Sequence, residues 1–339
     1  MAFVSLRDMS VSFGATPALR GVSLSLGRGD ALGLVGESGC GKSVTWLAAL
    51  GLLPGTAQVT GEVLIDGSDA LTMPVGQLEK IRGGRIAMIF QDPASSLNPV
   101  HRIGRQIVEA LTLHRGIAGA EARAEAKRLL DQVGIPDAAR RLDGYPHELS
   151  GGQNQRVMIA MALAGQPEML VADEPTTALD VTIQAQILDL LRALRRDTGM
   201  ALVLISHDLG VVAETCDRIA VMYAGRIVEE APSETLFRNP QHPYTRGLMG
   251  ALPPISGERQ RLVSIRGSVP DPNDMPAGCA FAPRCADRFA ACDTSDPANT
   301  PVGHGHRAAC LGVREWQGAL RADGVRQTDG VRRTVGAFA

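Results

Sequence analysis

Short apolar segments bounded by glycine or polar residues recur through the first two thirds of the chain, and this pattern predicts β-strands. Residues 2–13 alternate between apolar and polar positions, whereas residues 31–35 form a continuous apolar run that ends at a glycine-rich loop. Strands are predicted at 2–13, 18–26, 31–35, 61–67, 85–90, 169–172 and 202–205, with a hairpin at 218–223 and 226–229. The chain therefore begins with a β-rich part and continues as an α/β protein.

Helical periodicity separates these strands. In residues 182–196 the apolar side chains fall on one helical stripe, formed by Ile183, Ile187, Leu190, Leu191 and Leu194. Residues 93–146 also follow a helical pattern, with a stripe formed by Ala122, Ala126, Leu129, Leu130 and Val133. Further helices are predicted at 42–53 and 153–164.

The pattern changes after about residue 253, where Pro, Gly, Asp and Cys dominate and periodicity is lost. We therefore predict a main domain over residues 1–255 with a helical subdomain at about 92–152. A small cysteine-rich extension is predicted at 256–315 and a loose polar tail at 316–339. No internal repeat is visible, so we expect one main domain per chain.

Composition excludes some classes of partner. The 339 residues carry a net charge of −2 and only 4% aromatic residues, which argues against nucleic acid held by bulk charge or by base stacking. No apolar run approaches the roughly 18–20 residues that a membrane-spanning helix needs. The N-terminus carries an acidic residue and lacks the order of a signal peptide. We expect a cytoplasmic protein that meets a membrane only through a partner.

A phosphate-binding loop is predicted between the strand at 31–35 and the helix at 42–53. Residues 36–43 read GESGCGKS and match the pattern G-x-x-x-x-G-K-[ST]. The glycines let backbone amides cradle phosphate oxygens, Lys42 reaches the β- and γ-phosphates, and the Ser43 hydroxyl can ligate Mg²⁺. Cys40 is a small filler whose pKa the helix N-terminus would depress. The predicted nucleotide-binding residues are Gly36, Glu37, Ser38, Gly39, Cys40, Gly41, Lys42, Ser43 and Val44.

Two adjacent carboxylates, Asp173 and Glu174, follow the apolar strand at 169–172. The tip of a buried parallel strand faces the ligand crevice of an α/β sheet. Asp173 therefore suits a role with Mg²⁺, and Glu174 can orient or deprotonate an attacking water. Such a pair is often only the start of a helix, and it gains weight from the phosphate loop.

A second anion site is predicted where LSGGQ, at 149–153, opens a helix. Ser150 and two glycines stand at this helix N-terminus. A plain serine cap would account for the segment if it stood alone. Two phosphate-binding helix starts in one chain instead predict a head-to-tail dimer, with ATP between one loop from each protomer.

Taken together and in this order, the motifs resemble the ABC ATPase family over residues 2–250. They are GESGCGKS, Gln91, LSGGQ, Asp173–Glu174, ALD at 178–180 and His207. The resemblance implies a P-loop NTPase fold with a RecA-like core, an antiparallel β subdomain and a helical subdomain that carries the signature.

The resemblance also assigns roles. Gln91 would sense Mg²⁺ and couple to the membrane partner, Asp180 would cross the dimer interface, and His207 would contact the γ-phosphate. Phe13 matches the aromatic residue that stacks on adenine, although a phenylalanine on an alternating strand is as often a core residue. The implied catalytic residues are Glu174, His207 and Gln91, and the implied Mg²⁺ ligands are Ser43, Gln91 and Asp173. The signature residues that would contact the ATP of the opposing subunit are Ser150, Gly151, Gly152 and Gln153.

A narrower similarity is to the ATPases of dipeptide, oligopeptide and nickel importers. It rests on QDPASSLNP (91–99), YPHELSGGQ (145–153), DEPTTALDVTIQAQIL (173–188), HDLGVVAE (207–214), NPQHPYTRGL (239–248) and GCAFAPRC (278–285). Asn154 departs from the family pattern without altering the signature itself.

The similarity implies a peripheral protein at the cytoplasmic face of the inner or plasma membrane. Its partners would be two transmembrane permease subunits, a second ATPase subunit (homologous or identical) and an extracytoplasmic solute-binding protein, with no nucleic acid. Residues 91–106 are the expected permease contact. The rival functions are a soluble ABC ATPase acting on nucleic acid or the ribosome, and an exporter subunit.

Four of the six cysteines fall in the last fifth of the chain with the spacing C-x5-C-x6-C-x17-C, at Cys279, Cys285, Cys292 and Cys310. Disulfides are the poorer explanation in a reducing compartment, and the short knuckles of zinc modules are absent. Four such thiolates fit a cubane [4Fe–4S] cluster, which the importer resemblance also implies. Zinc, with His304 or His306 as a ligand, and free or redox-active thiols remain alternatives.

Overall fold

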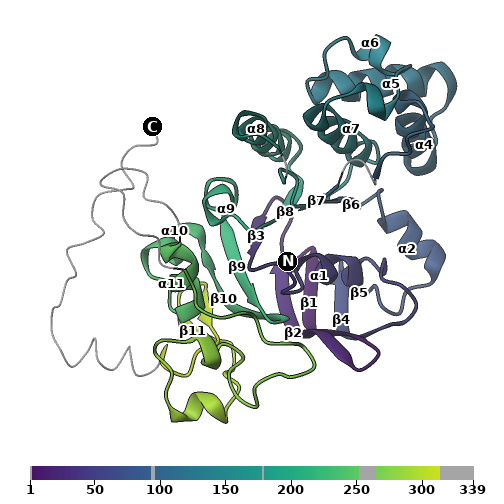
Figure 1. The fold of residues 1–339 in the computed structure, drawn as a ribbon. Coiled ribbons are helices and arrows are strands. Elements are labelled where there is room, and N and C mark those ends of the chain that lie inside the picture. The colour runs from purple at the N-terminus through teal and green to yellow at the C-terminus, as the bar shows by residue number, and fades with distance from the viewer. Residues whose placement is uncertain (1, 93–95, 178, 252–263, 314–339) are drawn as a thin grey trace.

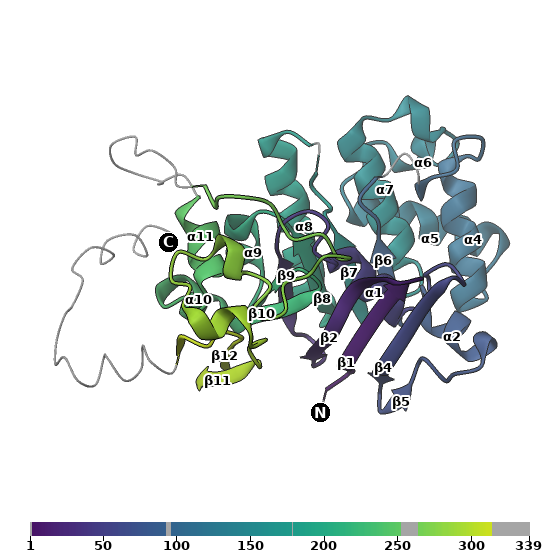
Figure 2. The same cartoon turned by 60° about the horizontal axis from the view of Figure 1, so that its bottom comes forward.

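The computed structural model describes residues 2–92, 96–177, 179–251 and 264–313. Figures 1 and 2 show a central sheet with helices around it, a group of helices at one end and a small irregular region at the other. The predicted polar tail at 316–339 lies outside the described residues, as do Ala178 and residues 256–263 of the predicted extension.

The first part of the chain forms an antiparallel four-stranded sheet in the order β2-β1-β4-β5. Its strands are β1 (Val4–Phe13), β2 (Thr16–Leu26), β4 (Ala57–Ile65) and β5 (Ser68–Asp69). The alternation seen in the sequence buries one face of β1, including Val4, Leu6 and Val11, against the core. This is the expected antiparallel β subdomain.

The central sheet has eight strands in the order β11-β12-β10-β9-β3-β8-β7-β6. Its first six strands along the chain are β3 (Ala31–Val35), β6 (Ile86–Ile89), β7 (Met169–Asp173), β8 (Ala201–Ser206), β9 (Arg218–Tyr223) and β10 (Arg226–Pro232). Strands β6, β7, β8, β3 and β9 run parallel. Because β3, β7 and β8 are buried at every position, they read as continuous apolar runs. Their carboxyl ends meet at one edge of the sheet.

Helices follow the strands and pack around them. They are α1 (Lys42–Ala49), α2 (Val75–Ile81), α8 (Val181–Thr198), α9 (Leu209–Thr215), α10 (Ser233–Arg238) and α11 (Pro243–Gly250). The helix predicted at 42–53 ends earlier than expected, because Gly51 has a φ of 61° and leaves the helical conformation. Helices α2, α9, α10 and α11 were not delimited by the sequence analysis.

The helical subdomain stands beyond β6 (Figures 1 and 2). It contains α4 (Ile103–Arg115), α5 (Gly119–Gln132), α6 (Ala138–Arg141), η1 (Pro146–Glu148) and α7 (Gly151–Leu163). Helix α5 packs on both α4 and α7. Its predicted apolar stripe is buried there, at Ala122, Ala126, Leu129, Leu130 and Val133.

At the opposite end lies the described part of the cysteine-rich extension, residues 264–313, which we call the cysteine module (Figure 1). It contains η2 (Ala282–Arg284), η3 (Ala290–Asp293), β11 (Thr300–Gly303) and β12 (His306–Ala308). Strand β12 pairs with β10, so the module prolongs the central sheet. His306 and Glu229 reinforce this pairing with a buried contact of 2.8 Å between Nε2 and Oε1.

Candidate active site

The loop between β3 and α1 forms an anion cradle. Gly36, Gly39 and Gly41 have positive φ values of 157°, 77° and 104°. A Cβ at Gly36 would lie 2.2 Å from the carbonyl oxygen of Met222, and one at Gly41 would lie 2.5 Å from Leu19, so both positions require glycine. Helix α1 has no side-chain cap and no acidic residue in its first turn. Its amides are therefore available to an anion.

Lys42 and Cys40 are both buried in this loop. Lys42 Nζ donates to the carbonyl oxygens of Gly36, at 2.8 Å, and Glu37, at 3.1 Å, which holds its charge inside the cradle. Burial raises the pKa of the Cys40 thiol. The lowered pKa expected from the helix N-terminus is therefore wrong, because desolvation outweighs that effect. Cys40 acts as a packing residue.

The carboxylate of Asp173 lies at the end of β7 and is almost fully buried. Burial raises its pKa, while a hydrogen bond with Ser43 works in the opposite direction. Its Oδ1 atom has no hydrogen-bond partner. A buried, unpaired carboxylate oxygen is costly unless a cation or an ordered water satisfies it, and oxygen ligands are what Mg²⁺ prefers. Asp173 and Ser43 therefore fit a Mg²⁺ site beside Lys42.

Three side chains converge on Glu174 Oε2, and two of them come from the ends of neighbouring strands. Gln91 Nε2, just beyond β6, donates at 3.1 Å, and Thr177 Oγ1 donates at 2.8 Å. His207 Nδ1, just beyond β8, lies 3.5 Å away. The Glu174 side chain is 16% exposed and that of His207 is 64% exposed, so the carboxylate lies at the base of the site and the imidazole at its mouth. Sequence reasoning did not identify Thr177.

The signature segment lies in the helical subdomain, away from the phosphate loop of its own chain (Figure 1). Ser150 caps α7 by accepting a hydrogen bond from the Gln153 amide at 3.3 Å, and Gln153 Oε1 accepts from the Ser150 amide at 3.1 Å. Ser150 and Gly151 are exposed, and Gly152 faces Ile183. The chain therefore does not bring its two predicted anion sites together.

The remaining predicted nucleotide and dimer residues lie on separate elements and loops. Phe13 ends β1 and is half-buried against the N-terminal core. Ser38 is exposed in the loop, and Val44 lies in α1. Asp180 is exposed and caps α8, accepting a hydrogen bond from the Ile183 amide at 2.9 Å. No interaction joins these residues to one another within the described part of the chain.

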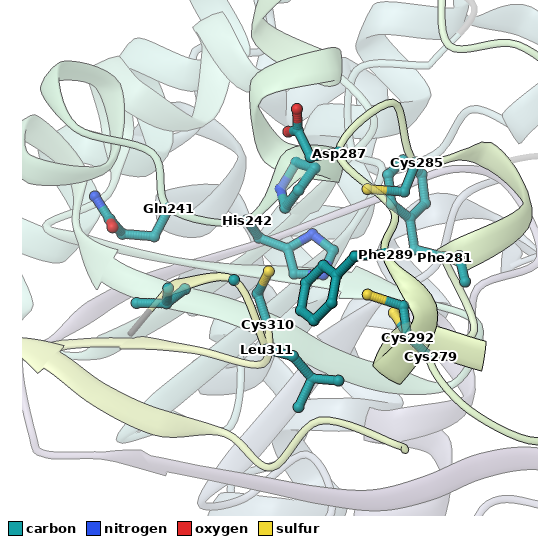
Figure 3. Close-up of a pocket in the computed structure, with 14 residues that line it drawn as sticks. Gln241, His242, Cys279, Phe281, Cys285, Asp287, Phe289, Cys292, Cys310 and Leu311 are labelled. Atoms are coloured by element: carbon teal, nitrogen blue, oxygen red, sulfur yellow. The ribbon is translucent and has the colours of Figure 1, made fainter. Parts of the chain in front are cut away.

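The four clustered cysteines line one cavity of about 80 Å³ in the cysteine module, together with His242, Phe281 and Phe289 (Figure 3). Burial raises the pKa of the Cys285 thiol to about 11. No group of three or more His, Cys, Asp or Glu side chains among the described residues is arranged to hold a single metal ion. His306, a candidate zinc ligand, is instead paired with Glu229.

Two residues far along the chain also reach the phosphate loop, and sequence reasoning missed both. Arg284, in the cysteine module, contacts the Glu37 carboxylate. Tyr244, in α11, accepts a hydrogen bond from the Glu37 amide. Both lie in segments that carry the importer similarity, Tyr244 in NPQHPYTRGL and Arg284 in GCAFAPRC. Only the folded chain, however, brings them near Glu37.

Comparison with known proteins gives the family. The ABC transporter family model matches residues 19–177, and that of the oligopeptide/dipeptide transporter C-terminal region matches residues 228–292. A putative peptide import ATP-binding protein of Brucella abortus is 51% identical, over 91% of this chain and 94% of the relative. This chain belongs to the ABC transporter family.

Further members of the family have similar lengths. The oligopeptide transport ATP-binding protein of Haemophilus influenzae is 47% identical over 88% of this chain and 92% of the relative. A dipeptide transport ATP-binding protein of Bacillus subtilis is also 47% identical, over 91% and 93%. As a member of this family, the chain is an ABC-type ATPase.

Solved ABC structures share the fold. CbiO1 of Clostridium perfringens, part of an ABC transporter complex, has a TM-score of 0.61 at 26% identity, covering 70% of this chain and 91% of that protein. A dimeric ATP-binding cassette in a post-hydrolysis state with ADP and Pi has a TM-score of 0.60 at 31% identity, covering 68% and 98%. The predicted fold class is confirmed. None of the helices in the described residues is both long and apolar enough to span a bilayer.

Proposed function

We propose that this chain binds and hydrolyses ATP to energise an ABC importer of di- and oligopeptides or related small solutes. The observation that carries the proposal is the convergence of Gln91, Thr177 and His207 on Glu174, beside the phosphate cradle. The names of the relatives, which are peptide, oligopeptide and dipeptide transport ATP-binding proteins, support the substrate class. They favour this function over that of a soluble ATPase acting on nucleic acid or the ribosome.

In this proposal the loop from Gly36 to Val44 binds the triphosphate through its amides, and Lys42 faces the β- and γ-phosphates. Lys42 is preorganised, because Gly36 and Glu37 carbonyls already hold its ammonium in the cradle. Phe13 would stack on the adenine ring. Mg²⁺, when bound, neutralises phosphate charge, and Ser43, Asp173 and Gln91 would hold it.

Glu174 would orient and deprotonate the attacking water. Thr177 and Gln91 fix its carboxylate through hydrogen bonds, so that little reorganisation is needed at the reaction step. His207 is exposed at the mouth of the site and would contact the γ-phosphate. Its 3.5 Å separation from Glu174 places the acceptor for the water proton and the phosphate contact side by side.

A second copy or a homologue would complete the site. Ser150, Gly151, Gly152 and Gln153 form an anion-binding helix start that its own phosphate loop does not use. The exposure of Ser150 and Gly151 supports their contact with the ATP of the opposing subunit. Asp180, exposed at the start of α8, would lie at the same interface.

We further propose two permease subunits and an extracytoplasmic solute-binding protein as partners, with this chain peripheral at the cytoplasmic face of the membrane. Residues 91–106 would contact the permease. In this stretch Val100 is 75% exposed, while Gln106 is buried and holds the turn through hydrogen bonds to the Asn98 and His101 carbonyls. A stiff turn that presents an apolar side chain suits a docking contact.

The cysteine module would hold a [4Fe–4S] cluster on Cys279, Cys285, Cys292 and Cys310. What supports this proposal is that all four cysteines line one cavity, together with Phe281 and Phe289 (Figure 3). Zinc fits less well, since His306 is engaged with Glu229. The proposed role is structural, and the ATP site does not depend on it for chemistry.

Purification of the intact membrane complex through a tag on this chain tests the function. We expect two permease proteins and a solute-binding protein in the preparation, with ATP hydrolysis in proteoliposomes that rises when peptide-loaded binding protein is added. Recovery of ribosomal proteins in place of a permease, or hydrolysis unaffected by any loaded binding protein, would contradict the proposal.

A further inference from the structure

We propose that Arg284 of the cysteine module is a positioning residue for ATP binding, which acts by holding and neutralising Glu37 in the phosphate loop. Arg284 Nη1 lies 2.9 Å from Glu37 Oε2, although 247 positions separate the two residues. The Arg284 side chain is only 5% exposed and that of Glu37 is 29% exposed. The guanidinium is thus shielded from water and the carboxylate is partly shielded, unlike the many exposed ion pairs of this chain.

Several contacts fix the guanidinium in place. Arg284 Nε donates to the Arg266 carbonyl at 2.9 Å. The guanidinium carbon lies 5.7 Å from the ring centre of Tyr223 and 6.0 Å from that of Phe281, within the range of cation–π attraction. An arginine held on three sides keeps its position with little loss of side-chain entropy. Arg284 therefore presents a fixed positive charge to the loop.

Two contacts hold Glu37. Its carboxylate accepts a hydrogen bond from Arg284, and its amide donates one to the hydroxyl of Tyr244 at 2.9 Å. Tyr244 is fully buried and contacts the Phe281 ring at a centroid distance of 5.5 Å. Both contacts thus come from the C-terminal part of the chain, which supports the loop from outside the ATPase motifs.

The charge of Glu37 is the reason that this support matters. The loop is built to hold phosphate, yet Glu37 places a carboxylate within it. An uncompensated negative charge at this point would repel a triphosphate. Arg284 cancels that charge, so its removal alone is expected to weaken ATP binding, and removal of the Glu37 carboxylate as well is expected to restore it.

Arg284 also ties the loop to the cysteine cavity. It ends η2, whose Ala282 amide donates to the Cys279 carbonyl at 2.9 Å, and it directly precedes Cys285. Both cysteines line the cavity. The inference rests on the proposed ATP site and not on the identity of what the thiols hold.

The test is the dissociation constant of a fluorescent ATP analogue with Mg²⁺ for the full chain, purified without oxygen. We expect Arg284→Met to weaken binding about tenfold, a deficit that shrinks at high salt. Adding Glu37→Gln to Arg284→Met should restore most of the lost affinity, because no carboxylate is then left to repel the triphosphate. The matched control is Arg288→Met, because Arg288 pairs with Asp293 inside the module, at 2.7 Å, and not with the loop.

A merely structural role gives a different pattern. If the ion pair only docks the module, Glu37→Gln weakens binding as much as Arg284→Met does and the double variant is not rescued, which overturns the proposal. Unchanged binding by Arg284→Met overturns it as well. Lys42→Ala, measured in parallel, must abolish binding. If it does not, the ATP site itself is misassigned, which separates failure of the proposed function from failure of this inference.

Discussion

Glu174 occupies a backbone conformation that few residues other than glycine adopt, with a φ of 45°. The end of β7 imposes this conformation, because the Glu174 amide donates a hydrogen bond to the Ile205 carbonyl of the neighbouring strand at 3.0 Å. Non-glycine residues in this region are costly and persist where the surroundings determine them. Here the strain turns the carboxylate toward Gln91 and Thr177, with its position set before any substrate arrives.

Glu174→Gln tests this residue. The amide keeps the shape and most contacts but cannot accept a proton, so ATP turnover should fall by at least about 10²-fold. ATP-dependent dimerisation should persist or strengthen, because the phosphate contacts remain. Phosphate release and size-exclusion chromatography with ATP measure the two effects. Glu79→Gln, on the exposed side of α2, is the control, and near-parental hydrolysis by Glu174→Gln would remove the proposed role.

At the scale of elements, the start of α7 is a proposed anion site that the phosphate loop of the same chain does not reach. Ser150 and Gln153 cap each other. The other amides of the first helical turn have no partner within the helix. The two glycines differ in their surroundings. A Cβ at Gly151 would lie 3.7 Å from Leu179, an ordinary contact, whereas one at Gly152 would lie 2.6 Å from Ile183. Only Gly151 accepts a side chain without moving its neighbours.

Gly151→Asp uses this difference. An acidic residue in the first turn favours helix α7 itself, so the chain should fold normally and bind ATP with nearly parental affinity as a monomer. In the dimer the new carboxylate would face the partner's triphosphate, and ATP-dependent dimerisation should fall by at least about tenfold. Analytical ultracentrifugation with Glu174→Gln as the background measures it. Weaker binding by the monomer would mean that the signature serves its own site.

The turn η2 and the cysteines beside it give a second prediction at this scale. Chain purified without oxygen should be brown and carry about four irons and four sulfides, as a cubane cluster requires. Cys285→Ser should remove the colour and expose the module to protease, since few large apolar side chains hold it together. Cys216→Ala is the matched control, because Cys216 is buried in the main core, away from the cavity. A colourless preparation with one zinc per chain would contradict the cluster.

Elements with a clear period were predictable from the sequence, and those defined by long-range pairing were not. The stripe of α5 and the continuous apolar run of β7 each identify the element and its buried face. Helices α9 and α10 have only seven and six residues, too few to show a period. Strand β12 has three residues, and only its pairing with β10 makes it a strand. The Arg284–Glu37 contact is invisible to sequence for the same reason.

At the scale of the whole molecule, the two halves of the proposed ATP site lie apart within one chain. The phosphate loop follows β3, and Asp173 and Glu174 lie at the end of β7 in the central sheet. Ser150 instead caps α7, which belongs to the helical subdomain (Figure 1). The family motifs indicated both halves of this proposed site. Their spatial separation agrees with the head-to-tail dimer that the two helix starts predicted from the sequence.

The pairing of β12 with β10 has one more consequence, for solubility. Without the cysteine module, β10 would be the last strand of the central sheet, with unpaired amides and carbonyls along one side. Such an edge is a template for aggregation. Glu229, which is fully buried, would also lose His306 and keep only the amides of Gln241 and His242 as partners.

A chain ending at residue 255 should therefore self-associate in size-exclusion chromatography at concentrations where the full chain elutes normally. Equal elution of the two would show that β10 tolerates exposure. In this sense the cysteine module covers the edge of the central sheet and prevents that edge from pairing with other copies of the chain.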